Sequence, residues 1–405
     1  MHSTATDRRR FLGLLAAGAV GGFGLVGRVT VASAASATLL GQARPGLQAD
    51  GDAYLAARRQ NGRYEVAVFK DDGSVKRRID LPDRGHSFAI DAARGRAVAF
   101  GRQPGFYAVA FGLSEGQQSL VPEKGRHFFG HGVFTPDGKL MAATENDYEA
   151  GQGVIGLYDA GGPQPSWRRV GEWPTYGVGP HEIVLMPDGR TACIANGGLL
   201  THPDYGKLIL NRDSMNSSLA YIDLHTGQLL EQVFLPEALR NLSIRHLALD
   251  GGGKVWFGCQ YEGPRGHEPP LVGCHRRGEA LVFADVGHVA SGWRAMKGYV
   301  GSLACDESGR LVATTSPVGG VAMFWNACSL MQVGSVSLFD GCGVAPAPGG
   351  GFLISSGQGD LWRITPGESA PAGAQLLRAE PLLEDSNSSW DNHMRRVRSQ
   401  MPDTV

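Results

Sequence analysis

Hydrophobic and polar residues alternate in short runs along most of the chain, and one arrangement recurs. Each copy has a short apolar strand, a turn that contains glycine, and a second apolar strand. The copy from His131 reads HGVFTPDGKLMAATEN, and the copy from His181 reads HEIVLMPDGRTACIANG. In both copies, Pro-Asp-Gly marks a tight turn between alternating strands, as a β-hairpin requires. The pattern therefore predicts a succession of β-hairpins, with few long helices.

The copies recur at intervals of about 50 residues. The six clearest have starts 45, 50, 65, 56 and 41 residues apart, and a weaker copy lies around residues 46–60. Third and fourth strands follow the hairpins, for example at residues 154–159, 219–224 and 229–235. The six clear starts are His86, His131, His181, His246, Ser302 and Gly343.

Seven units of four strands predict an all-β fold, a seven-bladed β-propeller over residues 38–383. A single blade cannot bury both of its faces, so blades must stack, and ring closure removes the open ends. Six or eight blades stay open as alternative counts. A pair of β-sandwiches or a β-helix fits less well, because a sandwich would not repeat and β-helix rungs are shorter than this interval.

Two copies carry insertions, over residues 197–218 and 262–278. Each insertion leaves the second strand at its far end. Because equivalent positions in a propeller lie at the same height, we expect both insertions to project from the same face of the ring.

The N-terminus has the order of features of an export signal. Residues 7–13 read DRRRFLG, residues 12–26 are apolar, and small residues follow at 32–37. This order predicts a twin-arginine signal peptide over residues 1–37 and export of the folded chain to the periplasm. The apolar run is too short and too rich in glycine for a comfortable membrane span, but a retained anchor or a disordered tail stays open. Residues 384–405 are polar and are expected to form a C-terminal tail, frayed or as a short surface helix.

Composition narrows the class of protein. Removing residues 1–37 takes away four arginines and one acid, so the mature chain has 34 basic against 38 acidic residues. This balance lacks the basic footprint of a nucleic-acid binder, and no further run is long enough to span a membrane. The six cysteines lack the spacing of a zinc site. Cys259 and Cys274 flank one insertion and could form a disulfide, but small buried residues in strands are the favoured interpretation for most of the six.

The repeat also predicts where a binding site lies. The first strand of a propeller blade lines the central channel, and its start lies at the same face as the end of the second strand. Polar residues gather at these two positions, so we expect them to meet at one channel mouth. The strand starts supply His86, His131, His181, Arg245 and His246, with His127 and Glu182 as neighbours; the strand ends supply Arg102, Glu145, Asn146, Asp147, Asn196, Gln260, Tyr261, Glu262 and Gln358.

Imidazole and carboxylate groups together suit iron, copper or zinc. His131, His181 and His246 are the candidate metal ligands, and the cofactor is expected to be iron or another transition metal, if any. The same groups could act as general acid and base. For any single histidine, a structural hydrogen bond to a neighbouring strand or turn is the alternative.

Several long runs resemble one known family. They include GRHFFGHGVFTPDGKLMAATENDYEAGQGVIGLYDA from Gly125, GPHEIVLMPDGRTACIANGG from Gly179, THPDYGKLILN from Thr201 and QYEGP from Gln260. The chain is similar here to the family called domain of unknown function 1513. The resemblance implies an exported propeller of the YVTN-like or quinoprotein-like type, related in architecture to WD40 repeats. It also adds His202, whose run matches the family, to the candidate ligand-binding residues.

The resemblance implies genetic neighbours as well, namely imelysin-type periplasmic iron-uptake proteins and di-haem oxidoreductase-like proteins. We therefore hypothesise a periplasmic binding protein, accessory to iron transport, whose mouth binds a metal, a metal complex or an imelysin-like partner. An enzyme that uses the same mouth, as a lactonase-like hydrolase or an oxidoreductase component, is the first alternative. A protein-interaction scaffold that uses the two insertions is the second. The activity of the family is not established, so no catalytic residue is carried over.

Overall fold

The computed structural model describes residues 52–398, except residues 115, 207, 288–291 and 370–374. The chain divides into two units, Met1–Arg44 and Pro45–Val405, and all described residues belong to the second. The expected signal peptide, residues 1–37, lies outside the described residues. Within the described part, no helix is long and apolar enough to cross a membrane.

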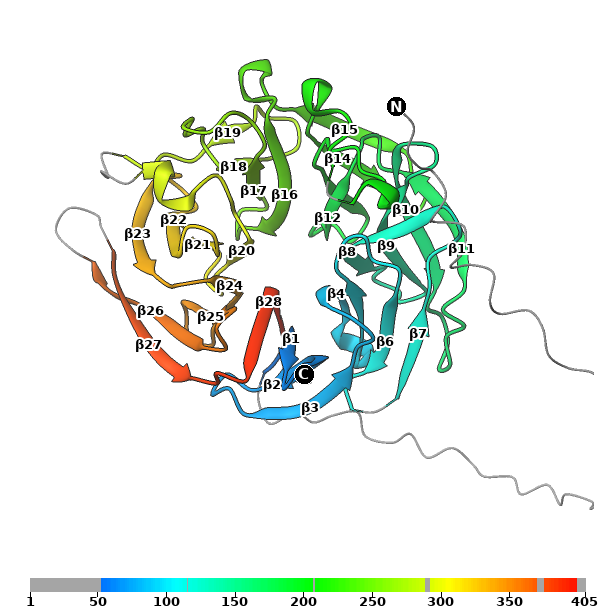
Figure 1. Cartoon of the computed structure of the whole chain (residues 1–405), viewed down its shortest axis with the longest axis horizontal. Helices are drawn as coiled ribbons and strands as arrows, with labels where there is room; N and C mark the ends of the chain where they lie inside the picture. Colours follow the sequence, from blue (N-terminus) through cyan, green and yellow to red (C-terminus); the bar gives the residue numbers. More distant parts are fainter. Residues whose placement is uncertain (1–51, 115, 207, 288–291, 370–374, 399–405) are drawn as a thin grey trace, which may run out of the picture. The chain divides into compact units, whose positions relative to one another are not determined.

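Seven antiparallel sheets of four strands each are arranged around a central channel (Figure 1), which confirms the predicted seven-bladed propeller. Within each sheet, consecutive strands pair in the order of the chain, except where β28 joins β1. From the inner to the outer strand, the blades are β28 (Ser388–Val397), β1 (Ala53–Gln60), β2 (Arg63–Phe69) and β3 (Val75–Asp80); β4 (Gly85–Asp91), β5 (Arg96–Gly101), β6 (Ala108–Gly112) and β7 (Gln117–Leu120); β8 (Arg126–Phe134), β9 (Leu140–Asp147), β10 (Gln152–Asp159) and β11 (Arg169–Pro174); β12 (Pro180–Leu185), β13 (Thr191–Asn196), β14 (Ser218–Asp223) and β15 (Leu229–Phe234); β16 (Leu242–Leu249), β17 (Val255–Tyr261), β18 (Val272–His275) and β19 (Val282–Phe283); β20 (Ser302–Cys305), β21 (Leu311–Ser316), β22 (Val321–Asn326) and β23 (Gln332–Ser337); β24 (Gly341–Pro346), β25 (Phe352–Ser356), β26 (Leu361–Ser369) and β27 (Gln375–Leu383).

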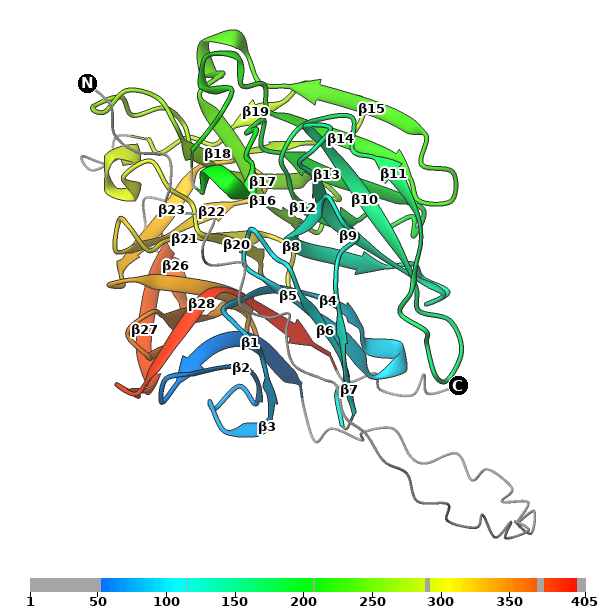
Figure 2. The same ribbon diagram turned by 45° about the vertical axis from the view of Figure 1, so that its right-hand side comes forward.

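The ring is closed by a strand that the sequence analysis did not predict. β28 pairs antiparallel with β1, so that Tyr54 lies opposite Arg396 and Gln60 lies opposite Ser388. Figure 2 shows the two strands side by side. The expectation of a polar tail from residue 384 is therefore wrong for Ser388–Val397, and the propeller extends beyond residue 383. The segment resembles a tail in the sequence because it is polar. Its polar residues become buried only against partners in the channel.

Burial follows the position of a strand in its blade. Outer strands alternate, as in β11, where every second residue is exposed. Second strands such as β13 are buried throughout, and Trp256 and Trp325 are fully buried in the largest apolar cluster. Inner strands are also largely buried, so a polar side chain on an inner strand has lost most of its contact with water.

All six cysteines lie within the described residues and are free thiols. The proposed bridge between Cys259 and Cys274 is therefore wrong. Cys274 pairs opposite Trp256, three residues along β17 from Cys259. Three residues of strand span about 10 Å, whereas a disulfide needs Cα atoms about 4.4–6.8 Å apart.

Candidate functional site: five histidines in the channel

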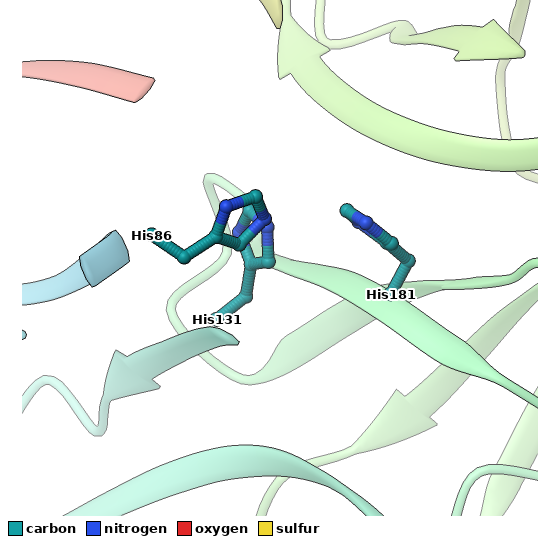
Figure 3. A group of neighbouring side chains, drawn as sticks. All are labelled: His86, His131 and His181. Atoms are coloured by element: carbon teal, nitrogen blue, oxygen red, sulfur yellow. The ribbon is translucent and has the colours of Figure 1, made fainter. Parts of the chain in front are cut away.

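Five histidines from five blades meet inside the channel. Four were predicted from the repeat, and the fifth, on β28, was not. All five side chains are buried, with 1–6% of the residue exposed. Neighbouring ring centroids lie 4.5–6.2 Å apart, and Figure 3 shows three of the rings reaching into one space from separate strands. We call this group the histidine cluster: His86 on β4, His131 on β8, His181 on β12, His246 on β16 and His393 on β28.

Irregular strand pairing aims these side chains into the channel. In four of the five inner strands, the histidine lies in a stretch that the pairing register skips. In β16 the skipped residue is Arg245, directly before His246. Such irregularities redirect a side chain that regular pairing would leave in the blade. Close approach also requires glycine at Gly130, where φ is +102° and a Cβ would lie 2.4 Å from the ring of His86.

His393 carries a signal that the sequence analysis missed. It lies 50 residues after Gly343, the start of the last recognised copy, and this is one repeat interval. After the six clear copies and the weak one, the interval alone predicts a further strand start at this position. That strand would pair with the weak first copy.

Burial keeps the imidazoles neutral. It lowers the pKa of His86 to about 4 and lowers those of His131, His181, His246 and His393 below the usual value for histidine. Several ring nitrogens make no hydrogen bond with any described residue, including Nε2 of His131, Nδ1 of His181 and both nitrogens of His393. Buried nitrogens are usually hydrogen-bonded, so the cluster is poorly explained as a set of structural hydrogen bonds.

Glu182 borders the cluster on one side. Its Oε1 lies 3.6 Å from Nδ1 of His131, and its Oε2 lies 3.4 Å from Nδ1 of His246. It also pairs with Arg395 of β28 and accepts a hydrogen bond of 3.1 Å from the backbone N–H of Leu247. Burial would raise the pKa of Glu182, but the facing ring of His131, the charge of Arg395 and the facing ring nitrogen of His246, which act as polar donors while the rings are neutral, hold it well below the usual range. Glu182 is therefore an anion inside the channel.

Asp391 has the equivalent role at His86. Its Oδ1 lies 3.5 Å from Nδ1 of His86, and the carboxylate also pairs with Arg84 and Arg102. Burial acts to raise the pKa of Asp391, but His86 and the two arginines hold it well below the usual range. Two buried carboxylates thus face the Nδ1 atoms of three histidines.

The geometry of the cluster fits a metal ion. Ligand nitrogens of His86, His131 and His181 all lie within 4.8 Å of one another, and so do those of His131, His246 and His393. An ion bound to imidazole at about 2.0–2.1 Å holds such nitrogens about 3.3 Å apart. The predicted ligands His131, His181 and His246 belong to one cluster but are divided between these two groups.

Cavities lie on both sides of the cluster. The cavity at the predicted mouth has a volume of about 570 Å³ and is lined by His86, His181 and His246. Both insertions reach it, through Arg212 and Glu262, whose side chains are ion-paired at 3.7 Å. This agrees with the expectation that the insertions share one face. A second cavity of about 490 Å³, lined by His131, Glu182 and Arg395, lies toward the hairpin turns. We call the first one the mouth cavity.

Glu145 and Asp147 do not join the cluster. Glu145 is fully buried within its blade, where it accepts a hydrogen bond of 2.6 Å from the hydroxyl of Tyr158 and pairs with Arg169 at 2.9 Å. Asp147 pairs with Arg126 at 2.6 Å. The position of a residue along a strand fixes its height in the ring, but alternate side chains point to opposite faces of the sheet. The repeat predicted the height of each residue in the ring but not the direction of its side chain.

The remaining predicted residues lie around the cluster without contacting it. His127 contacts Asn146 at 3.1 Å, and Tyr148 stands between the rings of His127 and His202. Asn196 donates a hydrogen bond of 2.8 Å to the backbone carbonyl of residue 175. The hydroxyl of Tyr261 lies 3.2 Å from His267 at the edge of a side cavity. Gln358 contacts Asp340 at 3.4 Å, whereas Arg102, Arg245, Gln260 and Glu262 line the mouth cavity as expected.

These features define a seven-bladed β-propeller with a histidine-lined channel. The chain belongs to the family described as "Protein of unknown function (DUF1513)", whose model matches residues 79–397 and so ends with the last residue of β28. No curated protein matches the chain.

Solved structures show the same architecture at low identity. The hydrazine synthase of Kuenenia stuttgartiensis is 13% identical with a TM-score of 0.54, and the alignment covers 80% of this chain and 91% of that one. The periplasmic gluconolactonase of Pseudomonas aeruginosa is 14% identical with a TM-score of 0.55, covering 87% of this chain and 100% of that one. At such identity the likeness extends to the fold alone.

Proposed function

We propose that this propeller binds a first-row transition-metal ion at the histidine cluster. The observation that carries the proposal is the convergence of five buried, neutral imidazoles whose nitrogens are largely without hydrogen-bond partners among the described residues. Leaving a buried polar atom without a partner costs about 1–3 kcal/mol. Neutral imidazole is also the form that binds metals, so no proton has to leave at neutral pH.

The carboxylates support the same function. A metal-binding histidine usually donates its other ring N–H to a carboxylate or carbonyl, which fixes the orientation of the ring. Glu182 faces Nδ1 of His131 and of His246, and Asp391 faces Nδ1 of His86. With Nδ1 facing a carboxylate, Nε2 is the nitrogen of these rings that is left for an ion. An all-imidazole set of ligands favours iron, copper, nickel or zinc over calcium or magnesium.

A place in periplasmic iron acquisition is part of the proposal. It rests on the export signal expected over residues 1–37 and on the iron-uptake proteins that the family resemblance implies as genetic neighbours. Iron is therefore the first ion to test, and an imelysin-like protein is the first partner.

The enzyme alternative gains no base from Glu145. Glu145 is held by Tyr158 and Arg169 inside the blade and does not line the mouth cavity. The scaffold alternative is less favoured because both insertions line the mouth cavity beside the cluster. We therefore propose binding as the function.

Elemental analysis of the purified full chain, followed by titration with Fe²⁺, Cu²⁺ and Zn²⁺, tests the proposal. We expect at least one ion per chain, and a roughly tenfold or greater loss of affinity in His131→Ala and in His181→Ala. His225→Ala is the matched control, because His225 is exposed and pairs with Asp223 outside the channel. Absence of binding for all three ions, or equal binding by all variants, would show the proposal to be wrong.

A further inference from the structure

We propose that the mouth cavity binds a small anion with carboxylate or phosphate oxygens, which Arg245 holds beside the histidine cluster. The inference deepens the proposed function, since it rests on an ion at the cluster for the second contact of the anion. It concerns the chemical class of the ligand that reaches that ion.

Arg245 is a partly buried cation without a close partner. Its side chain keeps 18% of its exposure, and its nearest ion-pair contact among the described residues is Oε1 of Glu262 at 3.9 Å. The buried Nε makes no hydrogen bond with a described residue. Arg169 offers a comparison within the same chain, because it is similarly buried but contacts Glu145 at 2.9 Å and Glu172 at 2.6 Å. Unlike Arg169, Arg245 keeps its capacity to bind an added carboxylate or phosphate.

Positive charge dominates the walls of the mouth cavity. Its permanent charges are those of the arginines and acids that line it. Three arginines line it against one acid, an excess of two positive charges. A bound metal ion would increase this excess and favour anions further. The arginines are Arg102, Arg212 and Arg245, and the acid is Glu262. Arg102 also pairs with Asp391, which lies outside the lining.

Neutral donors complete the lining. Tyr299 accepts a hydrogen bond of 2.8 Å from Nδ2 of Asn392, so its own hydroxyl proton is available to another acceptor. Ser243, one strand position before Ile244 on β16, lines the same cavity and its buried Oγ has no partner among the described residues. A carboxylate or phosphate accepts several hydrogen bonds at once, as this lining would provide. The volume of about 570 Å³ suits a small molecule.

The strand geometry sets the anion beside the ion. Arg245 is the residue that the register of β16 skips, and His246 follows it directly, so both side chains leave the strand at the same irregularity. His86, His181 and His246 line the cavity together with Arg245. An anion paired with Arg245 therefore presents further oxygens toward the cluster, where they can reach a bound ion.

Calorimetric titration of the full chain with succinate and with methyl phosphate, in metal-free and in zinc-loaded form, tests the inference. We expect at least one probe to bind the metal-free protein, with affinity that falls as salt is added, and to bind the zinc-loaded form roughly tenfold more tightly. Comparison of the two probes then tells whether the natural ligand carries carboxylate or phosphate. Binding of neither probe to either form would overturn the inference.

Matched variants locate the binding. We expect Arg245→Gln to weaken binding of the probe by roughly tenfold or more. We expect smaller losses of probe affinity from Arg102→Gln, at a more exposed residue, and from Tyr299→Phe, a conservative substitution. These two variants replace Arg245→Gln in the test if that variant does not fold. Arg190→Gln is the control, since Arg190 pairs with Asp223 and lies at the hairpin turn away from the mouth cavity. Equal affinity in all four variants would overturn the inference.

The two proposals fail separately. If zinc binds but neither probe does, the anion site is wrong and the metal site stands. If a probe binds through Arg245 but no ion binds, the anion site stands and the proposed metal function is wrong.

Discussion

The ring of His393 lies 4.7 Å from the ring of His131, centroid to centroid, and the two planes are nearly perpendicular at 85°. One ring belongs to the last described strand and the other to the third blade in chain order, so they meet only when the propeller is closed. Neither nitrogen of His393 has a hydrogen-bond partner among the described residues. His393 therefore lowers the stability of the metal-free fold while it supplies a candidate metal ligand.

Replacement of His393 by leucine separates these two effects. We expect His393→Leu to raise the free energy of unfolding of the metal-free protein by about 1 kcal/mol or more, because a buried imidazole without partners is removed. The same change should weaken ion binding roughly tenfold or more. Urea denaturation and metal titration measure the two effects. A variant that loses stability and keeps its ion affinity would show that His393 is structural.

Glu182→Gln tests the carboxylate beside the cluster. We expect a roughly 10–100-fold loss of ion affinity, because His131 and His246 lose the anion that faces their Nδ1 atoms. Glu145→Gln is the matched control, since Glu145 is equally buried and also pairs with an arginine, but lies inside a blade. Metal titration of both variants distinguishes them. The interpretation of Glu182 fails if both variants lose the same affinity.

The metal-free protein should lose stability as the pH falls. Burial depresses the histidine pKa values, to about 4 for His86, whereas an unfolded histidine titrates near 6.5. Between these values the unfolded chain binds more protons, so stability is fully present above about pH 6.5 and declines toward pH 4. Glu182 and Asp391, which face Arg395, Arg84 and Arg102, have pKa values held well below this window, so their contribution is lost at lower pH and the histidines dominate the slope.

Urea denaturation at intervals from pH 4.5 to 7.5 measures this slope. His393→Leu should have a shallower slope than the unchanged chain, because one depressed group is gone. Identical slopes would mean that His393 does not take up a proton on unfolding in this window.

Ring closure by β28 predicts a strong effect of truncation. Deletion of residues 384–405 removes the inner strand of one blade and exposes the edge of β1, so we expect loss of cooperative thermal unfolding. Deletion of residues 399–405 alone leaves β28 intact and should change little. Circular dichroism during heating compares the two. Cooperative unfolding of the longer deletion would show that the remaining strands close the ring without β28.

The sequence predicted the blades because every complete repeat has the same hydrophobic alternation and the same turn residues. It predicted His86, His131, His181 and His246 at one level because strand starts in a propeller share a height. It did not predict β28, since Asp391, Asn392 and His393 are polar and become buried only against charges from other blades.

Side-chain direction was the second quantity beyond the reach of the sequence. Glu145 and His131 have similar heights in the ring, but Glu145 turns into its blade while an irregular register turns His131 into the channel. The disulfide considered between Cys259 and Cys274 failed for a similar reason. Cys274 pairs three residues away from Cys259 along β17, and this offset cannot be read from their spacing in the sequence. Heights follow from repeats, whereas directions follow from individual hydrogen-bond registers.

The closing strand also has a meaning for synthesis. A nascent chain acquires His393, Asp391 and Arg395 only after the strands from β1 to β27 have been made, and two of these side chains complete the surroundings of His86 and Glu182. An unfinished or C-terminally clipped product would lack them. If the cluster binds an ion as proposed, such a product would not retain the ion as the intact propeller would. Ion binding would then distinguish intact molecules from fragments.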